Sequence, residues 1–296
     1  MADLTTIAYK LGAGAARLAP RPLAEAAALR LGRLAARRSP AARAQVVRNL
    51  QRVRPDLQGA ALDEAVRVTF ESYARYYVES FRLPGTSPDD LAKGFTTDGY
   101  EHLEAALAAG NGAIMALPHL GGWEWAGFWL TRVRDVPVTA VVERLEPPAL
   151  FEWFIELRRS FGFEVVPLGP EAGPATLRAL RANHVLALLC DRDLDGGGID
   201  VEFFGERTTL PAGPATLALR TGARILPTAI YFDGLIRRGV VRPPLDTTRR
   251  AGFREDVARV TQDVAHALED LIRRAPEQWH LLQPNWPSDR GDLTLP

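Results

Sequence analysis

Residues 112–124 read Gly-Ala-Ile-Met-Ala-Leu-Pro-His-Leu-Gly-Gly-Trp-Glu. The first six residues form a short apolar run, which is typical of a buried strand. Pro118 ends the run, two glycines follow the histidine, and helical periodicity begins near residue 122. A buried strand followed closely by a helix is the repeating unit of proteins with a parallel sheet.

The same alternation of strand and helix continues on both sides of this stretch. Apolar runs predict strands at 112–117, 137–142, 163–166, 185–190 and 224–231. Helical patterns lie near 100–109, 122–133, 147–161, 173–182 and 212–221, with a last helix near 253–274 before a tail that contains Pro and Trp. We therefore predict an α/β fold with a mostly parallel sheet flanked by helices.

The segment before residue 98 is predicted to be helical throughout. Prolines divide it into helices near 4–18, 22–38 and 40–53, and an aromatic-rich helix follows near 60–82. In the second helix an apolar stripe lies beside a basic face, formed by Leu23, Ala27, Leu31 and Leu34 and by Arg30, Arg33 and Arg37. Because no repeat or low-complexity linker interrupts the chain, we predict a single domain over 1–296 with an N-terminal helical layer.

The charge of the chain is unevenly distributed. The 36 basic and 36 acidic side chains among 296 residues cancel, which argues against a nucleic-acid-binding protein. Residues 1–54 nevertheless hold eleven basic and two acidic side chains, a net charge of +9, which leaves −9 for the remainder. At 47% hydrophobic and 24% charged residues, the composition excludes disordered, collagen and coiled-coil classes.

Targeting and redox signals are few. Cys190 is the one cysteine, so an intrachain disulfide and a cysteine metal cluster are excluded and a buried apolar role is expected. The N-terminus lacks the pattern of a secretory signal, and apolar runs such as 185–190 are far shorter than a membrane span. Any membrane contact is therefore expected to be peripheral.

Ionisable residues follow three of the predicted strands. His119 and Glu124 follow the first, Glu143-Arg144 the second, and Asp191-Arg192-Asp193 the fourth. The carboxyl ends of parallel strands meet at one edge of a sheet, where active sites form. His119 is the candidate general base, and the glycines behind it could admit a substrate to the backbone.

A carboxylate at the other imidazole nitrogen would orient such a base, and two candidates exist. Asp191 could reach His119 across the sheet edge, and Glu124 could do so if the loop folds back. Asp191-Arg192-Asp193 could instead form a helix cap or a turn, and Glu143-Arg144 a solvated surface pair. The other histidines, His102, His184, His266 and His280, are expected to lie on the surface or in the core.

Other reaction classes can be compared with the sequence. It contains no Gly-x-Ser-x-Gly elbow, no Walker loop and no His-Glu-x-x-His pair. The Asp191-Arg192-Asp193 tripeptide does match the Asp-x-Asp by which many glycosyltransferases hold a divalent metal. A metal-dependent glycosyltransferase and a non-catalytic lipid-binding protein therefore remain alternatives.

The block from Pro118 to Glu124 resembles the His-x4-Asp/Glu motif of glycerolipid and lipid A type acyltransferases. Further blocks resemble the actinobacterial phosphatidylinositol mannoside acyltransferases: Ala74–Tyr77, Val142–Leu145, Arg158–Phe163, Asp191–Leu194, Phe203–Glu206, Leu210–Ala215 and Trp279–Pro284. They run in order from about residue 60 to the tail.

The resemblance implies transfer of a long acyl chain, commonly palmitoyl, from acyl-CoA to a mannose hydroxyl of a phosphatidylinositol mannoside, without metal or cofactor. Another lipid acceptor, a lipid A precursor or a lysophospholipid, is the alternative within this class. The family's roles fall on His119 as general base, on Asp191 as its charge-relay partner, and on Glu124, the acidic end of the motif. Glu143 and Arg158 would line the polar groove near the sugar, and Arg192 is a further candidate for substrate binding.

The resemblance also implies action at the cytoplasmic face of the plasma membrane. Anionic lipids attract surface Lys and Arg, and a basic amphipathic helix can lie in the interface without spanning it. We therefore expect residues 1–54 to form a basic membrane-docking segment on a peripheral enzyme, while a solvated arginine-rich layer is the alternative.

Overall fold

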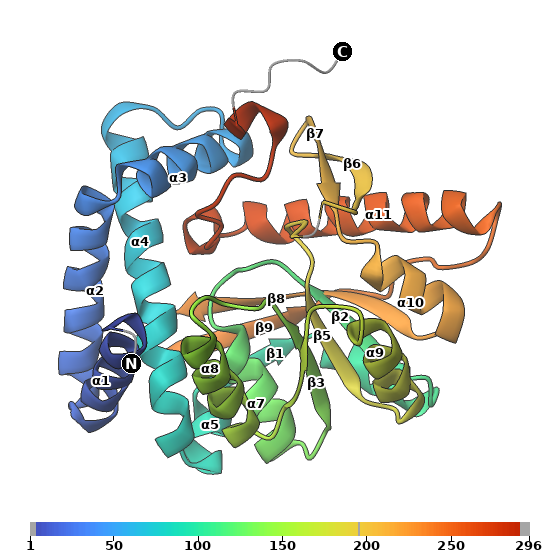
Figure 1. Ribbon diagram of the computed structural model, residues 1–296, viewed down its shortest axis with the longest axis horizontal. Coiled ribbons are helices and arrows are strands. Elements are labelled where there is room, and N and C mark those ends of the chain that lie inside the picture. Colours follow the sequence, from blue (N-terminus) through green and yellow to red (C-terminus); the bar gives the residue numbers. More distant parts are fainter. Residues whose placement is uncertain (1–3, 195, 291–296) are drawn as a thin grey trace.

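The structure, a computed structural model, describes residues 4–194 and 196–290. Its centre is a seven-stranded sheet in the order β1-β9-β8-β2-β5-β3-β4 (Figure 1). Strands β8, β2, β5, β3 and β4 are parallel, β9 runs antiparallel to β8, and β1 is parallel to β9. The predicted α/β fold with a mostly parallel sheet is thereby confirmed.

The predicted strands are all present, and four more accompany them. The sheet consists of β1 (Phe95–Asp98), β2 (Ala113–Leu117), β3 (Val138–Val142), β4 (Glu164–Pro167), β5 (Val185–Leu189), β8 (Arg224–Asp233) and β9 (Ile236–Val241). A separate antiparallel hairpin is formed by β6 (Ile199–Phe203) and β7 (Glu206–Leu210). Each of the four unforeseen strands, β1, β6, β7 and β9, contains two or more polar or charged residues.

Helices cover both faces of the sheet. They are α1 (Leu4–Leu18), α2 (Arg21–Arg38), α3 (Pro40–Val53), α4 (Gly59–Arg82), α5 (Pro88–Lys93), α6 (Tyr100–Ala108), α7 (Trp123–Val133), α8 (Pro148–Ser160), α9 (Ala172–Arg181), α10 (Gly213–Thr221) and α11 (Phe253–Arg273). Short 3-10 turns lie at η1 (Leu83–Gly85), η2 (Pro276–Gln278) and η3 (Pro287–Arg290).

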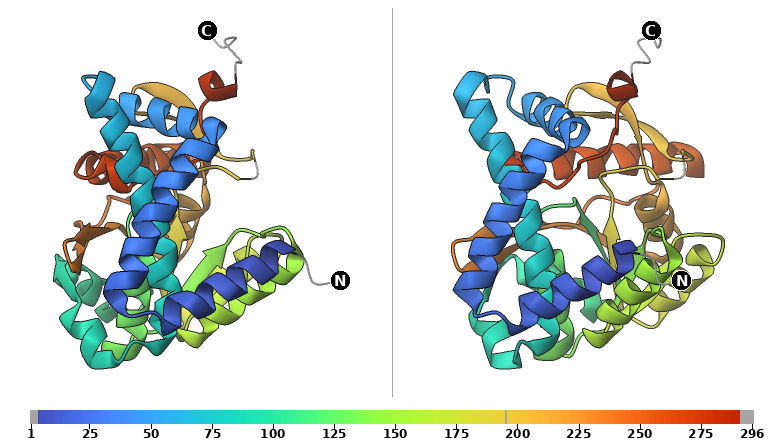
Figure 2. Two further views of the ribbon diagram at one scale, coloured as in Figure 1. Left: turned by 90° about the vertical axis from the view of Figure 1, so that its left-hand side faces the viewer. Right: turned by 60° about the vertical axis from the view of Figure 1, so that its left-hand side comes forward.

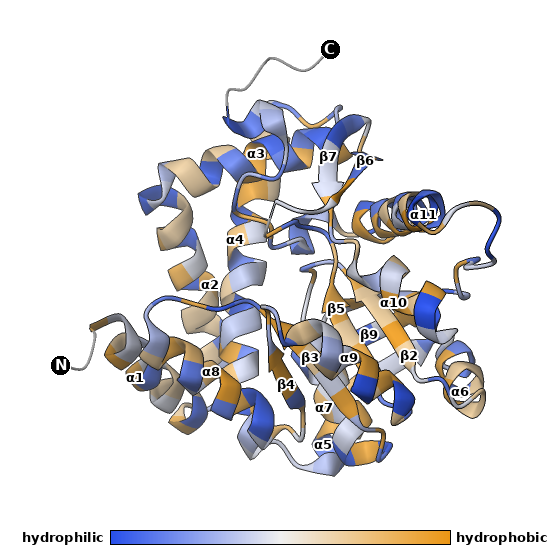
Figure 3. Cartoon of the chain, turned by 45° about the vertical axis from the view of Figure 1, so that its right-hand side comes forward, coloured by the Kyte–Doolittle hydropathy of each residue, from blue (hydrophilic) through white to orange (hydrophobic). Residues whose placement is uncertain are grey.

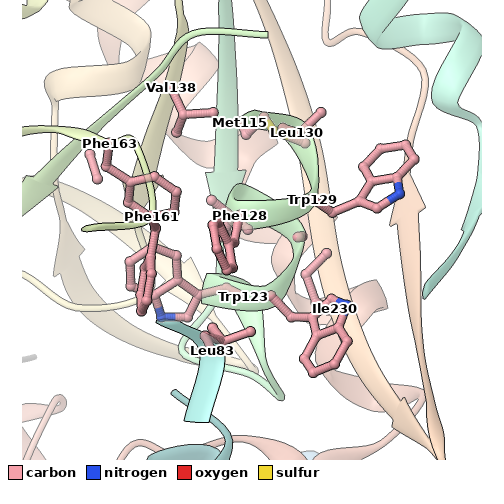
Figure 4. Packing of buried hydrophobic residues seen from close by; sticks show 14 of the residues in the cluster. Leu83, Met115, Trp123, Phe128, Trp129, Leu130, Val138, Phe161, Phe163 and Ile230 are labelled. Atoms are coloured by element: carbon pink, nitrogen blue, oxygen red, sulfur yellow. The ribbon is translucent and has the colours of Figure 1, made fainter. Parts of the chain in front are cut away.

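Strand β2 joins two cores because its side chains alternate between the faces of the sheet. Met115 and Leu117 pack with α7 and with Phe161, in the cluster drawn in Figure 4. Ile114 and Ala116 pack on the opposite face with residues of α10 and α11. All five residues of β2 are buried, which explains the unbroken apolar run in its sequence.

The N-terminal layer is built on α4. Figure 2 shows α2 along α4 and α1 extending beside α8. The face of α2 that packs on α4 consists of small residues, Ala24, Ala28, Gly32 and Ala36. A methyl group at Gly32 would lie 2.6 Å from the Phe70 carbonyl oxygen, so glycine permits this close approach.

The predicted leucine stripe of α2 lies on the outside. Leu23 and Leu31 are 64% and 59% exposed, and Leu11 and Leu18 of α1 are 69% and 89% exposed. In Figure 3 both α1 and α2 carry segments coloured as hydrophobic. No helix within the described residues is long and apolar enough to cross a membrane.

The basic side chains of the N-terminal layer differ in their partners. Some pair with acids beyond residue 54: Arg33 with Glu71, Arg43 with Asp63, Arg48 with Asp289, and Arg52 with Glu206 and Asp289. Others form no ion pair with any residue that the structure describes: Lys10, Arg30, Arg37 and Arg38. The unpaired charge is thus on α1 and α2, whereas the arginines of α3 bind the rest of the molecule.

Candidate active site

His119 lies in the short loop between β2 and α7. Within this loop Gly121 has a φ of +59°, and a methyl group there would lie 1.8 Å from the Ile230 carbonyl oxygen. Close packing of the loop against β8 therefore requires glycine. The expectation that the two glycines admit a substrate to the backbone stays a prediction.

The imidazole of His119 is held by Asp191, which follows β5. Its Nδ1 lies 2.6 Å from Asp191 Oδ1, and its backbone N–H donates to Asp191 Oδ2 at 2.9 Å. The side chain of Asp191 is fully buried, while that of His119 is 31% exposed. The structure thus places Asp191, of the two candidate acids, at the imidazole.

Asp191 is suited to remain ionised. Burial opposes its charge, but the attraction and hydrogen bonds of His119, together with the Trp279 indole, hold the pKa of Asp191 below its usual value. A buried carboxylate at Nδ1 fixes the tautomer that leaves Nε2 as proton acceptor. No hydrogen bond to Nε2 is formed within residues 4–194 and 196–290. The pair can therefore accept a proton from a hydroxyl group.

Glu124 occupies a different environment in the first turn of α7. Its Oε1 accepts from the Tyr76 hydroxyl at 2.5 Å and from Arg158 Nη2 at 3.1 Å, and its Oε2 from Ser80 Oγ at 3.4 Å. Burial raises the pKa of Glu124 against the opposing charge of Arg158. These contacts assign Glu124 to a buried ion pair with Arg158.

The other predicted site residues border one cavity of about 510 Å³. Arg192 Nη2 lies 2.5 Å from Glu143 Oε2, so this ion pair forms part of the wall. The Arg158 guanidinium lies over the Trp123 ring at 5.4 Å, and its Nε is buried without a hydrogen-bond partner in the described residues. His119, Glu143, Arg158 and Arg192 thus meet at one cavity.

Much of the remaining cavity wall is apolar. Apolar side chains come from β3, β5, α8, α9, α10 and the connection after β4, and include Val141, Phe154, Leu168, Leu177, Leu188 and Leu217. The buried Cys190 also lies here, and burial raises the pKa of its thiol, as expected for an apolar role. A cavity lined by both charged and apolar side chains is suited to a ligand that combines a polar head with a hydrocarbon chain.

Two residues at this site were not identified from the sequence. Trp279 donates its indole N–H to Asp191 Oδ2 at 2.7 Å. His280 borders the cavity, bonds Ser72 Oγ through Nε2 at 2.8 Å, and donates its backbone N–H to the His119 carbonyl at 2.7 Å. Burial lowers the pKa of His280 to about 3. His280 was expected on the surface or in the core, and it is buried; its position at the cavity was not predicted. The Trp279–Pro284 block was the one signal for both.

Asp193 has partners separate from those of Asp191. Its carboxylate accepts from the backbone N–H groups of Gly196 and Gly198 at 3.2 and 2.9 Å, and from Thr209 Oγ1 at 2.8 Å. Across the described residues, no group of three or more His, Cys, Asp or Glu side chains is arranged to hold a metal ion. These contacts resemble a turn more closely than a metal-binding Asp-x-Asp motif.

Comparison with known proteins gives concordant matches. A sequence model described as bacterial lipid A biosynthesis acyltransferase matches residues 4–288. The chain is 44% identical over 253 residues to a phosphatidylinositol mannoside acyltransferase of Mycobacterium tuberculosis, covering 84% of this chain and 78% of that protein. It is 39% identical over 293 residues to a phosphatidylinositol mannoside acyltransferase of Mycolicibacterium smegmatis, covering 98% and 94% of the two chains.

Proposed function

The chain belongs to the bacterial lipid A biosynthesis acyltransferase family, and on this premise we propose that it acylates a phosphatidylinositol mannoside. The donor is acyl-CoA, the acyl group is a long chain such as palmitoyl, and the acceptor is a mannose hydroxyl. The names of both relatives support this acceptor, and the match to the second extends over nearly the whole chain. The charged and apolar residues that line the cavity support a substrate with a polar head and a hydrocarbon chain.

The observation that carries the mechanism is the 2.6 Å contact between His119 and Asp191 at the cavity. His119 Nε2 takes the proton of the mannose hydroxyl while the hydroxyl oxygen attacks the thioester carbonyl. The new C–O ester bond forms, the C–S bond breaks, and the coenzyme A thiolate leaves with the proton that the imidazolium returns. Asp191 holds the Nδ1 proton and stabilises the imidazolium during transfer.

The remaining charged residues serve substrate binding in this proposal. Glu143 and Arg192 offer an acceptor and a donor at the cavity wall, which suits the hydroxyls of a sugar. Arg158 also faces the cavity, and its planar guanidinium suits a sugar or an anionic group. Glu124 holds Arg158 in place through the buried ion pair and acts through that arginine.

A transfer assay tests donor, acceptor and base together. Purified protein is incubated with labelled palmitoyl-CoA and a panel of mannosylated and unmannosylated phosphoinositides, a lipid A precursor and a lysophospholipid. We expect label on the mannosylated acceptors, with or without a metal chelator. Preferred acylation of a lipid A precursor or lysophospholipid would identify the alternative acceptor. No acyl transfer, together with chelator-sensitive transfer of a sugar from a nucleotide sugar, would favour the metal-dependent glycosyltransferase.

Substitution of the base tests the mechanism directly. His119→Ala should lower turnover by about 10² to 10⁴-fold, the usual contribution of a general base. The matched control is His266→Ala, because His266 is an exposed histidine that bonds Gln262 on α11. Wild-type turnover by a folded His119→Ala protein would exclude this mechanism, and the absence of transfer by the wild-type protein would favour a lipid-binding role.

We further propose that α1 and α2 attach the enzyme peripherally to the cytoplasmic face of the plasma membrane. Five of their leucines, Leu4, Leu11, Leu18, Leu23 and Leu31, are largely exposed. They lie on the same two helices as the unpaired cations Lys10, Arg30, Arg37 and Arg38. Apolar side chains enter the lipid interface while cations attract anionic headgroups. This proposal narrows the docking segment from residues 1–54 to the first two helices, because the arginines of α3 are paired internally.

Vesicle sedimentation tests this attachment. We expect binding to vesicles that contain anionic lipid, weakened by salt and by replacing Leu11 and Leu18 with serine. The matched control is Leu235→Ser, because Leu235 is an exposed leucine that lies outside α1 and α2. Binding that ignores both anionic lipid content and salt would contradict the electrostatic part of the proposal.

A further inference from the structure

The C-terminal segment 276–290 passes directly behind the His119–Asp191 pair. It runs from η2 to η3 beside α3, at the upper part of Figure 1. Trp279 is 3% exposed, and its Nε1 lies 2.7 Å from Asp191 Oδ2. An indole N–H buried against a buried carboxylate is a strong, charge-assisted hydrogen bond.

The donors to Asp191 come from two separate parts of the chain. His119 Nδ1 bonds Oδ1, whereas the His119 backbone N–H and the Trp279 indole both bond Oδ2. Asn285 Nδ2 also donates to the Asp191 backbone oxygen at 3.1 Å. The carboxylate plane is therefore fixed from both sides, and loss of the indole donor would leave Oδ2 with the backbone donor of His119.

The same segment also bonds the loop that carries His119. His280 N–H donates to the His119 carbonyl at 2.7 Å, and Gly121 N–H donates to the Gln278 carbonyl at 3.0 Å. Leu120 and Trp279 form an isolated antiparallel bridge between these hydrogen bonds. One short stretch thus sets the positions of both members of the pair.

The segment is anchored at its far end to α3. Asp289, whose side chain is fully buried, bonds Arg48 at 3.0 Å and Arg52 at 2.8 Å, and accepts from Gln45 at 2.8 Å. Asn49 Nδ2 bonds the Leu281 carbonyl at 2.7 Å. These contacts hold the segment against a rigid helix, so that Trp279 is a fixed donor for Asp191.

We propose that Trp279 is a positioning residue for the catalytic pair: its indole N–H fixes Asp191 Oδ2 so that Oδ1 stays aligned with His119 Nδ1. This inference rests on the proposed function, in which His119 is the base. It assigns a role to the tryptophan of the Trp279–Pro284 block. The role depends on the N–H group and not on the bulk of the ring.

The test removes only that N–H group. Replacing Trp279 by β-(3-benzothienyl)alanine substitutes sulfur for N–H in a ring of nearly the same shape, and Trp279→Phe provides a genetically simple second variant. The matched control is the same replacement at Trp286, because that buried indole donates to the Phe203 carbonyl at 3.1 Å in the same aromatic cluster. Rates are measured in the acyl-transfer assay across pH, with thermal unfolding recorded for each variant.

We expect the Trp279 variants to lose roughly 10- to 100-fold in kcat with little change in KM, the range for one hydrogen bond to a charged group. The acid limb of the rate profile should move to higher pH by about one unit, since a carboxylate with fewer donors holds the imidazolium proton more strongly. The Trp286 variant should unfold at a similarly lowered temperature with an unchanged profile.

The outcomes separate this inference from the proposed function. Wild-type turnover by His119→Ala would overturn the proposed mechanism itself. An inactive His119→Ala protein together with a wild-type rate and profile for the Trp279 variants would overturn only the positioning role. Equal losses at Trp279 and Trp286 without a shift of the acid limb would likewise overturn it, because packing alone would then explain the effect.

Discussion

The residues around the His119–Asp191 and Glu124–Arg158 pairs, here called the cavity edge, differ from the outer face of α1 and α2. The cavity edge buries charged side chains, whereas the outer face exposes apolar ones. At the edge Asp191 and Glu124 are buried, and each is bonded by several donors. On the outer face leucines such as Leu18 are exposed, and cations such as Lys10 form no ion pair within the described part of the chain.

This difference indicates two functions: orientation of a reacting group at the cavity edge and membrane binding at the outer face. A buried, paired charge is costly to create and is fixed in geometry, which suits the orientation of a reacting group. An exposed leucine beside an unpaired cation gains free energy only when an apolar, anionic surface covers it. Substitutions at the edge should therefore alter turnover and stability, whereas substitutions on the outer face should alter membrane binding alone.

The largest effect is expected from Asp191→Asn. The substitution keeps the shape of the side chain but removes the charge that stabilises the imidazolium, so kcat should fall by about 10² to 10⁴-fold. Asp193→Asn is the comparison, because that carboxylate bonds the backbone of a turn and Thr209. Equal losses in both variants, with a requirement for divalent metal, would contradict the separation of the two acids.

The second effect concerns the buried pair of Glu124 and Arg158. Glu124→Gln leaves a guanidinium in the interior without its counter-charge, which should lower the free energy of unfolding by about 3 kcal/mol. Glu156→Gln is the matched control on α8, since its pair with Arg159 is exposed and should contribute less than about 1 kcal/mol. Urea unfolding measures both, and equal losses would show that burial does not distinguish them.

The fold could be predicted from the sequence where strands are buried on both faces. Strand β2 is buried at every residue, so its sequence has no polar interruption and is recognised as a strand. Strand β9 was missed because Arg237 and Arg238 lie side by side within it, although Arg237 is buried in a pair with Glu79. Such a strand depends on a partner that local pattern does not reveal.

The candidate site could be predicted in part for a related reason. Strand ends brought His119 and Asp191 to one edge, but the choice between Asp191 and Glu124 depends on side-chain direction. Glu124 turns towards Tyr76 of α4, a contact that no spacing indicates. Trp279 and His280 lie far along the chain beyond the last strand, so only the resemblance drew attention to them. The leucine stripe of α2 was found, but periodicity could not tell which face packs on α4.

The third effect is a pH dependence that originates at the cavity edge. Burial lowers the pKa of His280 to about 3, whereas an unfolded histidine titrates near 6.5. Below pH 6.5 the unfolded state therefore binds a proton that the native state does not, and stability falls as pH falls towards 3. Between pH 6.5 and 5 this amounts to about 2 kcal/mol.

His280→Gln should remove this part of the slope while keeping a side chain that can bond Ser72. The exposed His266→Gln variant is the control and should keep the wild-type slope. The free energy of unfolding in urea at pH 6.5, 5.75 and 5 measures the difference. An unchanged slope in His280→Gln would mean that His280 is protonated in the native state, contrary to its burial.

The smallest effect should arise on the outer face, and it tests whether that face contributes to membrane binding without affecting catalysis. Lys10→Gln removes one unpaired cation from α1 and should weaken binding to anionic vesicles by about 1 kcal/mol, roughly fivefold. Arg43→Gln removes the same charge from α3, but Arg43 is already paired with Asp63, so its loss should change binding less. Neither variant should change kcat or the free energy of unfolding measurably, because neither side chain contacts the cavity edge.

If both variants weaken vesicle binding equally, attraction depends on net charge, and α1 has no special part in docking. If Lys10→Gln lowers kcat on detergent-dispersed substrate, the outer face and the catalytic edge are coupled, and the division between the two regions is wrong.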